Sequence, residues 1–84
     1  MANKRVNAII LQVVANQIDE ENPPATKQTY ERLIAEGFSD KEARDLLGCV
    51  VVSEIFDVMK QNKPFNEKRF VQALARLPTL PWDS

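Results

Sequence analysis

The stretch "FSDKEARDLLGCVVVSEIFDVMKQ", residues Phe38 to Gln61, decides the fold. It opens with the clearest helix-start signal in the chain, because Ser39 is a capping residue, Glu42 completes a capping box and Phe38 stands where a staple residue belongs. Its run from Cys49 to Val52 is apolar on nearly all sides, which is typical of a buried turn. Apolar residues recur at helical spacing along it, at Ala43, Leu46, Leu47, Val50, Ile55 and Val58. We therefore predict a helix that ends near Gln61 and lies at the centre of the fold.

The residues on the N-terminal side predict two more helices. The first runs from about Asn3 to Glu21 and presents an apolar face of Val6, Ile9, Ile10, Val13, Val14 and Ile18. Prolines 23 and 24 end it, and Pro24 suits the first turn of a second helix. That second helix continues to about Glu36, faces inward with Tyr30, Leu33 and Ile34, and stops at Gly37, where a left-handed backbone favours glycine.

A fourth helix is predicted after the cap residue Asn66. Phe65, before the cap, and Phe70 form a hydrophobic staple, and the buried face comprises Phe70, Val71, Leu74 and Leu77. The tail "LPTLPWDS" contains two prolines and cannot continue the helix. We expect its Leu80 and Trp82 to pack back onto the core. The fold class is thus all-α, a compact bundle of four helices with an extended C-terminal tail.

Length and composition limit the function. The 84 residues predict a single domain spanning 1–84. Because 11 basic residues face 12 acidic ones, the chain lacks the basic excess of nucleic-acid binders. No targeting segment or bilayer-spanning run is visible, so we expect no membrane association and a cytoplasmic location. With no histidine and one cysteine, the chain cannot assemble the usual zinc ligand sets, and we expect no metal or cofactor.

Catalytic candidates are weak, and we expect no enzyme activity. No histidine can act as a base, and Gly48 more often marks a close helix contact, here beside Tyr30 or Phe70, than a ligand site. Cys49 lies among valines and reads as a buried thiol rather than an activated nucleophile. Glu54 and Asp57, one turn apart, read as a solvated face, although Glu54 directly follows the apolar run.

From Val13 to Pro78 the order of short motifs resembles a group of small bacterial all-helical proteins of unknown function. The matching positions are Asn16–Gln17, Pro23–Pro24, Thr29, Arg32–Leu33, Gly37–Phe38, Glu42–Ala43, Glu54–Ile55–Phe56 and Lys63–Pro64–Phe65. Typical members of that group carry a histidine pair four residues apart on the first helix and another on the third, where it belongs to an H-E-A-x-H pattern. Those positions are Asn7 and Leu11, and Lys41 and Asp45, in this chain. The resemblance thus implies a metal site whose ligands are replaced, with Asn7, Lys41, Glu42 and Asp45 as its remnant.

Two functions remain open from the sequence. The first is a non-catalytic interaction or accessory domain that acts through its surface on an unidentified protein partner. The second is a small-molecule or metal-dependent activity at the remnant site. If the helices alternate in direction, the first and third begin at the same end, and Asn7 should lie in contact with Lys41 or Asp45.

Self-association is also expected, because a chain this small with no disulfide has little stability to spare. If the other helices cover the central one only in part, then Tyr30, Phe56, Met59 and Trp82 remain as large exposed groups, and a homodimer would cover them. If coverage is complete, the domain is a monomer.

Overall fold

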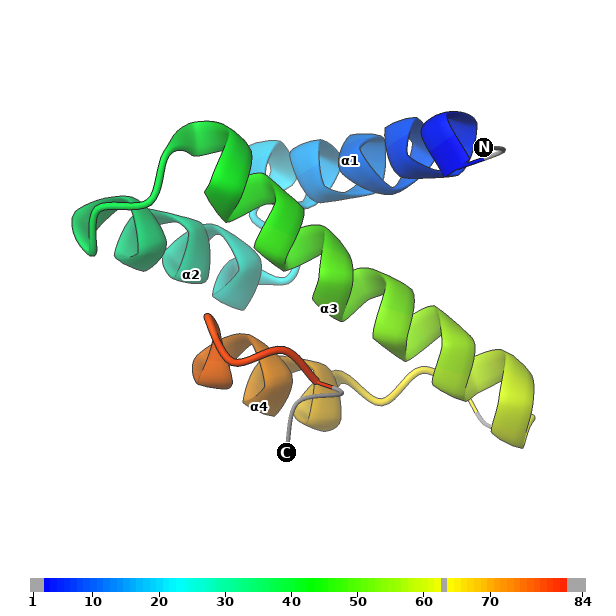
Figure 1. Cartoon of the computed structure of the whole chain (residues 1–84). Coiled ribbons are helices and arrows are strands. Elements are labelled where there is room, and N and C mark those ends of the chain that lie inside the picture. The colour runs from blue at the N-terminus through cyan, green and yellow to red at the C-terminus, as the bar shows by residue number, and fades with distance from the viewer. Residues whose placement is uncertain (1–2, 63, 82–84) are drawn as a thin grey trace.

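The structure, a computed structural model, describes residues 3–62 and 64–81. Within these ranges it describes the side chains from residue 8 onward. Within these ranges the chain forms α1 (Asn3–Glu20), α2 (Pro24–Ala35), α3 (Asp40–Gln61) and α4 (Glu67–Arg76), without a strand (Figure 1). The predicted all-α bundle of four helices is confirmed. The predicted ends of the first three helices agree with the observed ones to within one residue.

Local capping signals explain this agreement. The Ser39 hydroxyl accepts a hydrogen bond from the Glu42 backbone N–H at 3.1 Å, and the Glu42 carboxylate accepts one from the Ser39 N–H at 2.9 Å. Gly37 ends α2 with a φ of 104°, a conformation that favours glycine. At the start of α4 the Asn66 side chain accepts from the Arg69 N–H at 3.0 Å. Each of these ends is set by residues close together in sequence.

The central position of α3 is confirmed, because it packs against each of the other helices. Figure 1 shows α1 on one side of α3 and α4 on the other, with α2 contacting both. The condition for the contact predicted for Asn7, that the first and third helices begin at the same end, is not met. Figure 1 shows that α3 crosses α1 obliquely and that their first turns lie well apart. The geometric premise for placing Asn7 beside Lys41 or Asp45 therefore fails.

A single apolar core joins the described parts of the four helices. Its buried members are Val14, Ile18, Leu33, Ala43, Leu47, Val50, Val51, Phe70, Leu74 and Leu77. Other residues predicted to face inward are substantially exposed, namely Ile9, Ile34, Ile55 and Val71. On α2, Thr26 and Thr29 are buried instead, and the Thr26 hydroxyl donates to the Gln17 side chain at 2.9 Å. A hydrogen-bonded threonine can thus occupy a position that periodicity assigns to an aliphatic residue.

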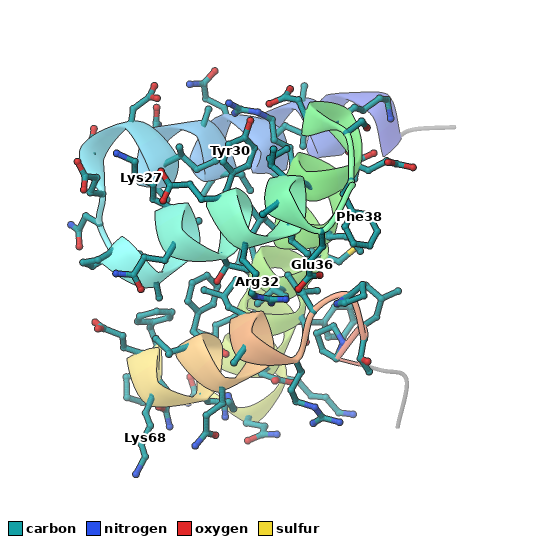
Figure 2. All side chains as sticks on the ribbon, turned by 90° about the vertical axis from the view of Figure 1, so that its left-hand side faces the viewer. Lys27, Tyr30, Arg32, Glu36, Phe38 and Lys68 are labelled. Carbon is teal, nitrogen blue, oxygen red and sulfur yellow. The ribbon has the colours of Figure 1, made fainter. Side chains whose placement is uncertain are left out.

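The C-terminal segment closes the core as predicted as far as the structure describes it. Leu77 is buried and Leu80 packs against the core. Trp82 lies outside the described residues. Arg32 of α2 reaches the end of α4, where its guanidinium donates to the carbonyl oxygens of Leu74 and Leu77 at 3.2 and 3.0 Å (Figure 2). The Leu74 oxygen also accepts from the Leu77 backbone N–H at 3.1 Å, so Arg32 adds a second donor to it and joins α2 to the end of α4.

Candidate functional site

An open hollow of about 370 Å³ lies between α1 and α3. It is lined by Ile10, Leu11, Lys41, Asp45, Gly48, Cys49 and Val52. The helices approach closely at Gly48, since a Cβ atom there would lie only 3.3 Å from Cγ2 of Ile10. The prediction that Gly48 marks a helix–helix contact is confirmed, but its partner is α1 rather than Tyr30 or Phe70. The small residues at this crossing leave the hollow beside it.

The hollow brings together only part of the predicted remnant site. Lys41 and Asp45 line it, as does Leu11. Glu42 takes no part, because its carboxylate is bound to the Ser39 N–H in the capping box. The side chain of Asn7 lies outside the described residues.

The only charged side chains among the residues lining this hollow form a pair with each other. The Lys41 ammonium donates to Asp45 Oδ2 at 2.8 Å, and the Lys41 side chain is 86% exposed. The hydrogen bond to Asp45, aided by their mutual attraction, raises the pKa of Lys41 above its ordinary value. Within residues 3–62 and 64–81, no group of three or more His, Cys, Asp or Glu residues could hold a metal ion. The polar groups of this hollow therefore consist mainly of the Lys41–Asp45 ion pair at the surface, and the rest of its lining is largely apolar.

Cys49 is half-buried in the same hollow. Two effects raise the pKa of its thiol: the larger is burial away from water, and the smaller is the nearby negative charge of Asp45. A nucleophilic cysteine requires the opposite shift, because the thiolate is the reactive form. The environment of Cys49 thus keeps it a neutral thiol at pH 7.

An apolar surface continues from the hollow along the second half of α3. It consists of Val52, Ile55, Phe56 and Met59, which are 37, 43, 65 and 77% exposed, and is called here the α3 apolar face. Val52 also lines the hollow, so the two features are continuous. The all-round apolar character of this helix therefore reflects burial on one side and an uncovered surface on the other.

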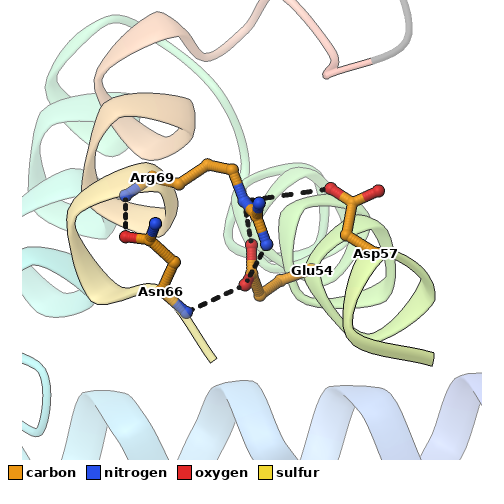
Figure 3. A network of polar contacts seen from close by, with 4 residues as sticks. All are labelled: Glu54, Asp57, Asn66 and Arg69. Carbon is orange, nitrogen blue, oxygen red and sulfur yellow. Dashed lines mark hydrogen bonds and ion pairs between the residues drawn. The ribbon is translucent and has the colours of Figure 1, made fainter. Parts of the chain in front are cut away.

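The opposite side of α3 carries a polar network that the sequence interpretation missed. Glu54 is only 6% exposed, and Arg69 of α4 donates to it from Nε at 3.1 Å and from Nη2 at 2.8 Å. The backbone N–H of Asn66 donates to the same carboxylate at 3.2 Å (Figure 3). Asp57 lies farther from Arg69, at 3.9 Å. The prediction of a solvated Glu54 is wrong because α4 covers this side of the helix.

The electrostatics of Glu54 follow from these bonds. The guanidinium of Arg69 first, and then the Asn66 N–H, stabilise the carboxylate and hold its pKa below the ordinary value in spite of burial. A second open hollow, of about 720 Å³, lies beside this network between α3, α4 and the C-terminal segment. Because Glu54 and Arg69 are engaged with each other, we assign the network a structural role: it fastens α4 to α3.

Comparisons with known proteins give no indication of function. The chain matches no protein-family model, no curated protein and no solved structure. Over the residues the structure describes, none of the helices has the combination of length and apolar character required to cross a bilayer.

Proposed function

We propose that this protein is a non-catalytic interaction domain and that the α3 apolar face, together with the adjoining hollow, is its binding surface. The observation that carries the proposal is the exposure of Val52, Ile55, Phe56 and Met59 on one side of one helix. Single exposed apolar residues are common on protein surfaces, but a continuous group of them normally marks a contact site. Spacings of three and four residues are those by which helices meet a protein partner.

The energetics favour a covered state of this surface. Each Å² of apolar area removed from water contributes about 25 cal/mol, and aromatic residues account for much of the binding energy of interfaces. Phe56 is 65% exposed and Met59 is 77% exposed, so most of their surface is available for such a contact. We place the domain in the cytoplasm as part of this proposal, since a chain with a single cysteine, which can form no internal disulfide, fits a reducing compartment. The nearly balanced charge favours a protein partner over nucleic acid.

The hollow supports a second hypothesis, a small-molecule or metal-dependent activity at the remnant site. Its support is that Leu11, Lys41 and Asp45 line one hollow although they come from different helices. Elemental analysis of the purified protein tests the metal form of this hypothesis: near-stoichiometric zinc, iron or nickel would favour it over the interaction domain.

The interaction hypothesis is tested by photo-crosslinking in cells. A photoreactive phenylalanine analogue replaces Phe56 in one variant and Lys68 in a control variant. Lys68 is exposed and projects from α4 away from the neighbouring helices (Figure 2). We expect irradiation to yield a discrete crosslinked protein product from position 56 and none from position 68. Irradiation without a product from position 56 would refute the proposed binding surface.

A further inference from the structure

One face of α3 carries a projection and a hollow at different positions along its length. Phe56 and Met59 project into solvent in the second half of the helix. Gly48 and Cys49, about two turns earlier, line the hollow beside α1. Cys49, Val52, Phe56 and Met59 follow the alternating spacing of three and four residues that lets two helices pack along a common line. The same helix face thus presents both parts of a complementary contact.

We infer that the occupant of this surface is a second copy of the chain, packed antiparallel along α3 about a two-fold axis near Val52 and Ser53. This inference rests on the proposed function, because it names the partner of the same surface. A two-fold contact uses one patch on both subunits, so every projection must meet a hollow on the same patch. Parallel pairing would instead place Phe56 against Phe56 and leave both hollows uncovered.

The axis fixes which residues meet. Cys49 and Phe56 lie equally far from it along the helix, so Phe56 of each copy faces the hollow beside Cys49 of the other. Leu11, 36% exposed on the α1 side of this hollow, would complete the contact with the ring. Burial of an aromatic side chain in a partner's pocket is the usual form of an interface hot spot.

The same register also matches charge. Asp45 and Lys60 lie equally far from the axis, so each copy brings its Lys60 near Asp45 of the other. Both residues are exposed in the isolated chain, and Asp45 already pairs with Lys41. Two such contacts at the rim would select the antiparallel register more than they would raise affinity. The net charge of −1 per copy adds little repulsion between subunits.

The size of the surface indicates how tightly two copies should associate. Stable interfaces bury about 800 Å² on each partner, with about 20–30 residues a side. The α3 apolar face has four residues, joined by the lining of one hollow, and is therefore smaller than the interface of a typical stable complex. We therefore expect a reversible dimer with a dissociation constant of roughly micromolar to tens of micromolar.

Sedimentation velocity of the purified full-length chain, from about 5 to about 500 µM, tests association across that range. The average mass should rise from 9.6 kDa toward that of a dimer with concentration. Phe56→Asp should weaken association at least about tenfold while leaving the helical circular dichroism unchanged, because the ring is exposed in the monomer. The control, Ile34→Asp, changes an exposed apolar residue on α2 and should associate as the wild type does.

Charge exchange tests the register. Asp45→Lys and Lys60→Asp should each weaken association, since each places like charges at both ends of the contact. An equimolar mixture of the two variants should associate more tightly than either alone, because every rim contact then joins opposite charges. A mixture that associates no better than the single variants would overturn the antiparallel register. So would efficient formation of a Cys49–Cys49 disulfide on oxidation, which parallel pairing predicts.

The outcomes separate the inference from the function on which it rests. Wild-type protein that stays monomeric at every concentration overturns the second copy as the partner. If position 56 then crosslinks to a different protein in cells, the interaction domain stands and only its partner changes. If position 56 crosslinks to nothing, both proposals fail.

Discussion

The carboxylate of Glu54 should contribute far more to stability than its acidic neighbour Asp57. Replacement of Glu54 by glutamine preserves the size of the side chain but removes its charge. It also puts an amide NH₂ where one carboxylate oxygen now accepts, so that a donor faces Arg69 or the Asn66 N–H. Because the site is almost fully buried, water cannot replace the lost bonds without cost.

The magnitude follows from the hydrogen bonds. A bond to a charged group contributes about 1.5–3 kcal/mol, and Glu54→Gln keeps part of the three-bond arrangement, so we expect a loss within that range. In a domain of this size the melting temperature should fall on the order of 10 °C. The control is Asp57→Asn, the same acid-to-amide change one turn away. Asp57 lies 3.9 Å from the same arginine and its side chain is 38% exposed, so its loss should be below about 0.5 kcal/mol.

Urea unfolding monitored by circular dichroism, at pH 7 and at lower pH, measures both effects. The folded chain holds the pKa of Glu54 below its ordinary value of 4.5. The stabilisation is therefore complete above about pH 4.5 and is lost as the pH falls through the lower folded pKa. The difference between wild type and Glu54→Gln should narrow over that acidic interval. If Glu54→Gln matches Asp57→Asn at pH 7, or if its deficit persists unchanged in acid, the assigned role of the carboxylate is wrong.

Three further predictions concern packing and the thiol. Gly48→Val should lower the free energy of unfolding by about 1–3 kcal/mol in a urea titration, because even a Cβ would lie 3.3 Å from Ile10; an unchanged value would mean that α1 and α3 can separate freely. Phe65→Ala should lower the free energy of unfolding by only about 1 kcal/mol. Phe65 packs on Phe70 with ring centres 5.7 Å apart, but it is 53% exposed. A loss of about 2–4 kcal/mol, as for a fully buried residue, would contradict that exposure. Cys49 should react with a colorimetric thiol reagent at least about tenfold more slowly in native protein than in urea, because burial raises its pKa; equal rates would make it a reactive thiol.

The sequence predicted helix ends well and packing only in part, for a physical reason. Caps such as Ser39 with Glu42 act over three residues, so the information is local. Burial depends on which helix lies opposite, and this changes along α3. Val51 is buried and Val52 is exposed, although both belong to the same apolar run. Glu54 is buried against Arg69, 15 residues away, and no periodicity within α3 predicts that partner.

For the candidate site, too, the sequence predicted part of the arrangement and missed the rest. Resemblance to the histidine-bearing proteins pointed to Leu11, Lys41 and Asp45, and the structure gathers these three around one hollow. Glu42 was assigned both to the capping box and to the remnant site, and one carboxylate cannot serve both. Its bond to the Ser39 N–H assigns it to the cap. The signal for the Glu54 network was an acid placed directly after an apolar run, which composition alone could not distinguish from a solvated face.

The support of α4 by its neighbours bears on how the protein opens. With 10 residues, α4 is shorter than the roughly 12–15 residues at which an isolated helix becomes even marginal in water. Its start is anchored by Glu54 of α3, and Arg32 of α2 binds the carbonyl oxygens of Leu74 in its last turn and of Leu77 just after it. If either contact breaks, one end of α4 is exposed to solvent, and the helix is then too short to stay folded on its own. Its backbone amides should therefore exchange with deuterium as one cooperative unit rather than fray residue by residue, and their common protection factor reports the combined strength of two distant side chains.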